Sequence, residues 1–437
     1  GLALGIALAF DAISDPVVGG ISDRVKGKFG RRHPMMALSA LPLAGLIILL
    51  FSPPDGLSQT GSFVWLTVFT ILVRTAITFF NVPHLALGAE MAKDYHQRST
   101  LFAYNMLIGG FGAMALYVAV FWLIFPTTEQ FNPGLLNEAG YQVFGWCAAI
   151  IIVAAMSISV FGTAPEIPYL RSPEATNQLS IRHLIADMRE VFREWDFRVI
   201  FVGFVLWFMF DGIQMVGLPF MGLHFWGFKT EELAYSGIAS FLAVPVAFIL
   251  IPILTKKFDK KHALIIGSLS FVILPNLLIG FRLLDVSWYP NNDSPWVLIN
   301  YLIAHFLAMS LGAVCAATYS SIYADIADVH ELRTHRRREG AIYSTQTFAT
   351  KAAGALGLIL GGFALDMINF PPNAVQGSVS DDVIWNLGLF FGPGMGILSA
   401  FGIGLFFLYR MNKTRHAEVL AQLKSRHERK KARVSVE

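Results

Sequence analysis

Two aspartates, Asp11 and Asp15, lie four residues apart inside an apolar stretch that runs from Leu2 to Ile21. In a helix this spacing places both carboxylates on one face, one turn apart. A charged side chain at the centre of a bilayer costs roughly 2.5 to 3.5 kcal/mol even on insertion scales, so embedded acidic pairs mark ion or substrate sites. The spacing therefore predicts a membrane-embedded site for a cation or a solute.

Oxygen ligands suit such a site because hard cations prefer carboxylates, hydroxyls and carbonyls to sulfur or imidazole. Pro16 has no N–H, so the carbonyl of Ala12, four residues earlier, loses its helical partner beside the acidic pair. The two carboxylates also titrate as a coupled pair, which makes a proton as suitable as a sodium ion. We expect no cofactor and no metal site beyond a Na⁺ site, because His84 and His305 have no neighbouring ligands at metal-binding spacing.

The composition places this site in a membrane protein. Hydrophobic residues make up 55% of the 437 residues, charged residues make up 14%, and the mean hydropathy is +0.56. Cys147 and Cys315 both fall within apolar spans, which argues against a disulfide framework. The net charge of +3 gives no support for nucleic-acid binding. No catalytic constellation is present in the sequence, so we expect the protein not to be an enzyme.

About eleven stretches are long and apolar enough to cross roughly 30 Å of hydrocarbon as helices. They lie near residues 2–21, 35–51, 63–88, 101–125, 143–161, 200–226, 237–254, 263–281, 296–323, 341–368 and 384–409. Alternate loops are rich in Lys and Arg, which predicts that these loops and the C-terminus are cytoplasmic. The first span then runs inward from the outside, so we expect one preceding helix to be missing from this sequence.

Two bundles of six helices follow from this count, with a polar segment between them. The predicted domains are an N-terminal bundle (1–163, first helix absent), a cytoplasmic linker with an amphipathic helix (164–199), a C-terminal bundle (200–411) and a basic cytoplasmic tail (412–437). Short basic turns with an embedded aspartate follow both the first and the seventh span, which indicates an internal repeat. The predicted fold class is therefore an all-α membrane protein of two helical bundles.

Motifs in the first span and the loop after it resemble known transporters. Gly20, Asp23, Arg24, Gly30, Arg31 and Arg32 resemble the signature loop of the major facilitator superfamily. The motif DAISDP (11–16), the tripeptide NVP (81–83) and the stretch AIYSTQTFATK (341–351) resemble the glycoside-pentoside-hexuronide:cation symporter family over essentially the whole chain. The resemblance implies the major facilitator fold and symport driven by a sodium, lithium or hydrogen ion.

The resemblance also implies roles for individual residues. It implies that Asp11, Asp15 and Thr78 bind the cation, with Ser14 in place of another polar family residue, and that Lys351 couples the ion to the substrate. An arginine that the family carries before the first aspartate is replaced here by Leu8. Arg74 shares a helical face with Thr78 and Asn81, at positions i, i+4 and i+7, and we expect it to supply the missing positive charge to the acidic pair.

A structural alternative is that Asp11 and Asp15 only form salt bridges with Arg74 and Lys351 that hold helices together. Paired embedded charges mark transport pathways more often than scaffolding, which favours the functional interpretation.

The sequence specifies the identity of the substrate less closely than the identity of the coupling ion. The family's sugar-binding aspartate, tryptophan and arginine correspond to Asn81, Leu85 and Asn105 here, which argues against a galactoside but leaves sugar binding open. Hydroxyls of a sugar can still hydrogen-bond a set of polar side chains, namely Asn81, Tyr104, Asn105, Asp211 and Gln214. Asp211 is equally suited to be a second ionisable coupling residue.

The overall prediction is cation-coupled symport of a sugar or glycoside by alternating access. The alternatives are a sodium-coupled lysolipid transporter with a laterally open cavity, a proton-coupled exporter of a small organic solute, and a receptor or membrane enzyme. The expected partners are a small-molecule substrate and the lipid bilayer, the expected functional unit is a monomer, and the expected location is the bacterial inner membrane.

Overall fold

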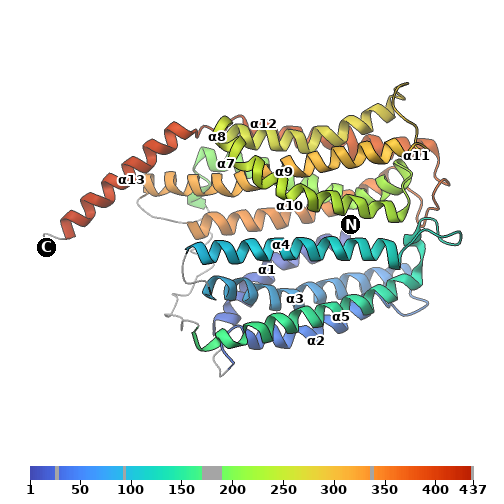
Figure 1. The fold of residues 1–437 in the computed structure, drawn as a ribbon, viewed down its shortest axis with the longest axis horizontal. Coiled ribbons are helices and arrows are strands. Elements are labelled where there is room, and N and C mark those ends of the chain that lie inside the picture. The colour runs from blue at the N-terminus through green and yellow to red at the C-terminus, as the bar shows by residue number, and fades with distance from the viewer. Residues whose placement is uncertain (25–28, 92–94, 170–188, 335–338, 435–437) are drawn as a thin grey trace. The chain divides into compact units, whose positions relative to one another are not determined.

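Every regular element of the described chain is helical (Figure 1). The computed structural model describes residues 1–24, 29–91, 95–169, 189–334 and 339–434. The helices are α1 (Leu2–Arg24), α2 (His33–Leu50), α3 (Gln59–Met91), α4 (Tyr95–Ala119), α5 (Glu138–Thr163), α7 (Trp195–Phe220), α8 (Thr230–Leu283), α9 (Pro295–Thr334), α10 (Glu339–Met367), α11 (Asp381–Leu389), α12 (Met395–Phe406) and α13 (Lys413–Val434). Short π-helical turns extend α4 and α7 and join α11 to α12.

Nine helices within the described ranges are long and apolar enough to cross a membrane. Helix α8 contains two of the predicted spans, which meet at Asp259, where the backbone lies at φ 67° and ψ 158° and turns the chain. The last predicted span is divided between α11 and α12 at Gly392, where ψ is −111° and Pro393 follows. The predicted spans are therefore helical. Eleven predicted spans correspond to these nine helices because α8 holds two spans and because α1, whose apolar part is the shorter Leu2–Asp11, is not among the nine.

Two compact units divide the chain by their internal contacts. Unit 1 comprises Gly1–Asn177, Met215–Phe241 and Gly354–Ser380, and unit 2 comprises Gln178–Gln214, Leu242–Ala353 and Asp381–Glu437. In unit 1, α1 packs on α3, and α2 packs on both α3 and α5. The predicted domain boundaries follow the order of spans along the sequence, and they stay a prediction.

In unit 1 the loop that follows α4 contacts the first turn of α8 and the loop that follows α10. Thr127 Oγ1 donates a hydrogen bond to Glu231 Oε2 at 2.7 Å, and the backbone N–H of Gln376 donates to the carbonyl of Asn132 at 3.1 Å. Hydrogen bonds therefore connect segments that are far apart along the chain.

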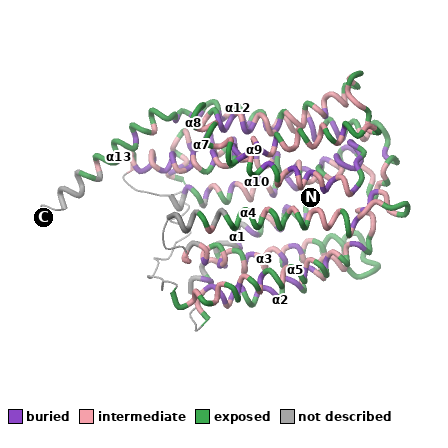
Figure 2. Tube along the Cα trace, viewed as in Figure 1, coloured by how far each residue is buried: buried purple, intermediate pink, exposed green. Residues whose placement is uncertain are grey.

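Many large apolar residues are exposed, as expected for helices in lipid, and Figure 2 shows exposed positions along the helices. Leu123 is 78% exposed and Phe161 is 75% exposed. A soluble monomer rarely exposes apolar patches of more than a few hundred Å², whereas in a bilayer such side chains meet hydrocarbon of equal polarity. The burial pattern thus agrees with the hydropathy of the spans.

Small residues let α7 and α12 approach closely in unit 2. A Cβ atom on Gly203 would lie 2.4 Å from the Phe406 ring and 3.0 Å from the carbonyl of Gly402. Without a strong hydrophobic force between helices in lipid, close backbone packing at glycine contributes much of the association. These two glycines therefore set the distance between the helices.

We expect Gly203→Val to lower the stability of the protein, because the valine side chain would overlap Phe406 and the backbone of Gly402. The cost of overpacking is about 1–3 kcal/mol, and it is measured as a lower melting temperature in detergent. Gly404→Val is the matched control, because a Cβ on Gly404 meets nothing within 4 Å. Equal melting temperatures for the two variants would contradict this account of the packing.

The basic tail forms α13, one face of which packs on unit 2. Val419 and Leu423 are buried, α13 contacts α9, and His416 Nε2 lies 3.1 Å from Asp328 Oδ2. The remaining face is largely exposed, as Figure 2 shows. The predicted amphipathic helix of the linker (164–199) lies largely outside the described residues.

Candidate functional site

Helices α1 and α3 bring Asp11 and Arg74 together inside unit 1. Arg74 Nε donates a hydrogen bond to Asp11 Oδ2 at 2.7 Å, and Arg74 Nη2 contacts the same oxygen. Asp11 is only 6% exposed, whereas the Arg74 side chain is 37% exposed. The embedded carboxylate therefore has a counter-charge that remains partly exposed.

The other carboxylate oxygen of Asp11 is buried and makes no hydrogen bond with the described residues. One turn before Arg74, the hydroxyl of Thr70 is also buried and unpaired within the described chain. Leaving a buried polar atom unsatisfied costs about 1–3 kcal/mol, and more for a charged group. Thr70 lies four residues before Arg74 and therefore on the same helical face. Its hydroxyl is a candidate cation ligand that the sequence interpretation missed.

Two hydroxyls predicted to serve the cation lie beside this pair. Ser14 Oγ donates to the carbonyl of Asp11 at 3.3 Å, and Thr78 Oγ1 donates to the carbonyl of Arg74 at 3.1 Å. Both residues are buried. Because each hydroxyl bonds to a backbone carbonyl on its own helix, each is held close to one member of the ion pair.

Asp15 belongs to α1, one turn after Asp11, and α1 continues through Pro16. The Asp15 side chain lies outside the described part of the structure, so its predicted ligand role stays a prediction. The same holds for the predicted ligation by the carbonyl of Ala12.

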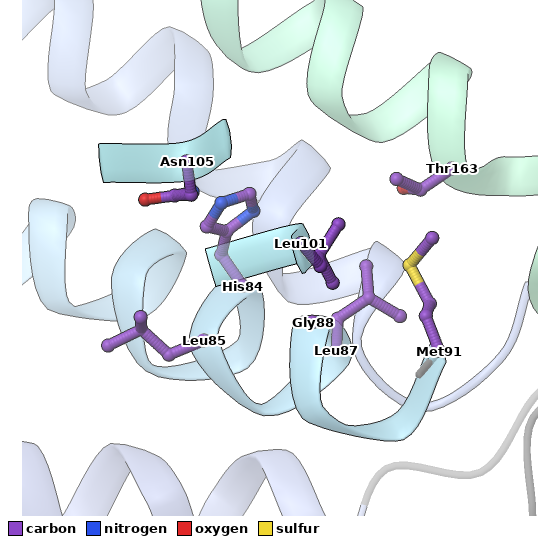
Figure 3. A pocket seen from close by; sticks show the side chains of 8 residues that line it. All are labelled: His84, Leu85, Leu87, Gly88, Met91, Leu101, Asn105 and Thr163. Atoms are coloured by element: carbon purple, nitrogen blue, oxygen red, sulfur yellow. The ribbon is translucent and has the colours of Figure 1, made fainter. Parts of the chain in front are cut away.

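Three of the predicted substrate residues lie on α3 and α4 in unit 1. Asn81, Tyr104 and Asn105 are all exposed, and α3 packs on α4. Asn105 also lines a small pocket with His84 (Figure 3). The arrangement brings amide and hydroxyl groups from two helices to an accessible surface, which suits hydrogen bonding to a hydroxylated solute.

The other predicted residues, Asp211, Gln214 and Lys351, belong to unit 2. Asp211 is exposed and Lys351 is half-buried. Gln214 Nε2 donates to the carbonyl of Phe391 at 2.8 Å, at the π-helical turn between α11 and α12. Its amide N–H₂ group therefore supports a broken helix, and its predicted role in substrate binding stays a prediction.

Each of the two repeated basic loops forms an ion pair with an acidic residue near the end of a later helix. In unit 1, Arg32 Nη2 lies 2.8 Å from Glu90 Oε1, and Arg31 also contacts Glu90. In unit 2, Lys260 Nζ lies 2.7 Å from Asp325 Oδ2. The weak sequence repeat thus has matching ion pairs, each formed with an acidic residue of the second span after the basic loop.

Glu194, directly before α7, forms a further ion pair in unit 2. The His330 ring, with Nδ1 at 3.7 Å, and the Arg333 guanidinium, with Nη1 at 2.9 Å, lower the pKa of Glu194 below its ordinary value of 4.5. A lowered carboxyl pKa stabilises the fold above the ordinary value, and the stabilisation is lost as the pH falls through the lowered value.

We therefore expect Glu194→Gln to lower the melting temperature at about pH 7 but hardly at about pH 3. The effect corresponds to about 1 kcal/mol at most, because Arg333 is 58% exposed and water screens the pair. Thermal unfolding of both proteins in detergent measures it. A deficit of equal size at both pH values would show that the charge of Glu194 is not its cause.

A helical chain that crosses the membrane repeatedly and buries an ion-paired carboxylate has the features of a membrane transporter. Residues 1–413 match the family described as MFS/sugar transport protein, where MFS denotes the major facilitator superfamily. Because this match covers most of the chain, the protein belongs to that family, and it is a transporter and not an enzyme.

Relatives from several organisms agree with this assignment. The uncharacterized symporter YjmB of Bacillus subtilis (strain 168) is 27% identical over 430 residues, which cover 96% of this chain and 85% of YjmB. The lactose permease of Leuconostoc lactis is 21% identical, covering 94% of this chain and 62% of the permease. The sodium-dependent lysophosphatidylcholine symporter 1-A of Danio rerio is 23% identical, covering 94% of this chain and 78% of the symporter.

A solved structure shares the fold. The nucleoside transporter NupG matches with a TM-score of 0.59 at 12% identity, covering 93% of this chain and 91% of NupG. The family match confirms the predicted family, this structure agrees with the predicted major facilitator fold, and the protein is an integral membrane transporter.

Proposed function

We propose that the protein carries a sugar or glycoside together with a cation, Na⁺ or H⁺, by alternating access. The observation that carries this proposal is the buried Asp11 carboxylate, which has one oxygen on Arg74 and the other without a partner in the described chain. The family description and the name of the lactose permease support a sugar, and the symporter relatives support a coupling cation.

Arg74 acts in this proposal as the resident counter-charge of the empty site. A cation that reaches Asp11, Asp15 and Thr78, with Ser14 beside them, competes with the guanidinium for the same carboxylate. Once the cation neutralises Asp11, Arg74 is released toward its exposed side and becomes available to a hydroxyl of the substrate. Cation binding then raises substrate affinity, and the substrate must raise cation affinity by the same factor.

The substrate is proposed to bind the polar groups of Asn81, Tyr104 and Asn105, with Asp211 and the carbonyl oxygen of Gln214 as further acceptors. Lys351 is proposed to sense the charge of the cation site and to couple it to the substrate. Amide and hydroxyl groups are suitable partners for sugar hydroxyls, because each donates and accepts hydrogen bonds.

The proposed location is the bacterial inner membrane with the C-terminus in the cytoplasm, and the proposed functional unit is a monomer. The excess of Lys and Arg in alternate loops supports this orientation.

The test is uptake by the protein reconstituted in lipid vesicles. Labelled mono- and disaccharides are offered with an inward gradient of Na⁺, Li⁺ or H⁺, and vesicles without protein serve as the control. We expect one ion gradient to drive accumulation of at least one sugar. Absence of uptake for every sugar and ion by correctly folded protein would contradict the proposal.

A second candidate is sodium-coupled transport of a lysolipid, which the similarity to the lysophosphatidylcholine symporter favours. The exposed Leu85 and the absence of the family's sugar-stacking tryptophan at that position are consistent with it. Binding of lysophosphatidylcholine by the purified protein, with no binding of any sugar in the panel, would select this candidate.

A further inference from the structure

A small cavity lies between α3, α4 and α5, beside the proposed sugar site. Its volume is about 100 Å³. Its polar lining is His84, Asn105 and Thr163, and its apolar lining includes Leu85, Met91 and Leu101. Figure 3 shows the His84 ring directed toward Asn105, with Leu101 beside it and with Met91 on the side of Thr163. Asn105 thus lines this cavity and also belongs to the proposed sugar site.

The orientation of His84 is fixed by two neighbours. Its Nδ1 lies 3.2 Å from the hydroxyl of Ser159 on α5, and the ring of Phe80, one turn earlier on α3, stacks on it at 5.2 Å between centroids. No described residue forms a hydrogen bond with Nε2 in the structure. Because Nδ1 is engaged with Ser159, Nε2 is the nitrogen left for a molecule in the cavity.

The size and lining of the cavity restrict what it can hold. An apolar cavity of about 150 Å³ accepts a benzene molecule, so this smaller cavity suits a short alkyl group. The leucine and methionine side chains provide the apolar wall, and one imidazole nitrogen provides a single hydrogen bond. Asn81 precedes His84 by three residues and lies on the adjoining part of the same helical face.

We propose that this cavity, the aglycone pocket (His84, Leu85, Met91, Leu101, Asn105 and Thr163), receives a short alkyl substituent of the transported glycoside, and that His84 Nε2 hydrogen-bonds the oxygen that carries the substituent. This inference rests on the proposed sugar symport. It makes His84 a residue that determines specificity: alkyl glycosides bind more tightly than the free sugars.

Gly88 also lines the pocket, and a side chain added there would narrow it. A Cβ atom on Gly88 would lie 3.7 Å from Leu101 Cδ2, which is an ordinary contact distance. Gly88→Val therefore fills part of the cavity. Gly109→Ala on α4 is the control, since a Cβ there meets nothing within 4 Å and Gly109 does not line the pocket.

The first measurement is the inhibition of labelled-sugar uptake by unlabelled competitors. The competitors are free glucose, galactose and xylose, and the methyl and isopropyl glycosides of these sugars. In the wild type and in Gly109→Ala we expect the alkyl glycosides to compete about tenfold better than the free sugars, as expected for one small apolar group in a fitted pocket. Gly88→Val and His84→Phe should abolish this ratio. Equal competition by free sugars and alkyl glycosides in the wild type would overturn the pocket and leave the proposed symport intact.

A second measurement does not depend on transport. In a Cys147→Ala background, Leu101→Cys places a thiol at the pocket, and Leu107→Cys places one on the exposed part of the same helix. We expect isopropyl glycosides, but not free sugars, to slow alkylation of the cysteine at 101 and to leave that at 107 unchanged. Equal protection by free sugars would overturn the pocket alone. Protection by lysophosphatidylcholine and by no glycoside would overturn both the pocket and the sugar symport, and no protection by any compound would overturn the pocket.

Discussion

Asp11→Asn is expected to remove the dependence of uptake on the coupling cation. Asparagine keeps the size of the side chain but loses the charge that attracts the cation and pairs with Arg74. Coupling free energies are typically 1–3 kcal/mol, so we expect the ion gradient to lose an effect of about 5- to 150-fold on apparent substrate affinity. Uptake into vesicles with and without the ion gradient measures this loss.

The outcome is informative only if the variant folds. Removal of the Asp11 charge leaves Arg74 without its partner, but the guanidinium is 37% exposed and can be hydrated. We therefore expect normal insertion and a modest fall in melting temperature. Asp366→Asn is a matched control, because Asp366 is another carboxylate of unit 1 outside the proposed site. Retention of cation-driven accumulation by folded Asp11→Asn would remove Asp11 from the proposed ion site.

Arg74→Leu is expected to reduce uptake even when uptake is counted per folded molecule, so that the loss of transport exceeds what the loss of stability explains. Without the guanidinium, the Asp11 carboxylate is buried with no counter-charge, which in fully buried pairs costs about 3–5 kcal/mol. Because the Arg74 side chain is 37% exposed, the pair is not fully buried, and we expect a cost near the lower end of that range, about 3 kcal/mol. Melting temperature and uptake per folded molecule are the two measurements.

The double variant Arg74→Leu with Asp11→Asn separates the structural alternative from the functional one. If the ion pair only joins α1 to α3, the double variant recovers stability and transports normally. If the pair belongs to the cation site, the double variant recovers stability, because no charge is left buried alone, but it does not recover cation-driven uptake. Arg74→Lys is the control that keeps the charge without the planar guanidinium. Normal transport by folded Arg74→Leu would contradict a coupling role.

Sequence patterning predicted the transmembrane segments because lipid imposes a simple condition on them. A span must be about 20 residues long and apolar, since its backbone can hydrogen-bond only within the helix. The predicted span 35–51 agrees with α2, which runs from His33 to Leu50. The predicted span 63–88 is shorter than α3, which runs from Gln59 to Met91, because polar ends of a helix extend beyond the apolar stretch.

The ion pair of Asp11 was also expected from the sequence, because Arg74, Thr78 and Asn81 repeat along one helical face. Thr70 lies on the same face at i−4 from Arg74, but an isolated threonine in an apolar span gives no signal that its hydroxyl lacks a partner. The pairing of Lys260 with Asp325 joins residues 65 positions apart. Such a contact depends on which helices are neighbours, which local periodicity does not specify.

The sequence by itself determined that this protein is a membrane protein. It also determined the positions of the helices along the chain and the carboxylates that carry the embedded charge. These properties depend on local hydropathy and helical spacing, which neighbouring residues specify directly. Only the tertiary structure decided that Arg74 uses one oxygen of Asp11 and leaves the other without a described partner, that the amide of Gln214 supports the break after α11, and that His84 faces a cavity. These properties depend on side chains from different helices, and the packing of those helices brings them together.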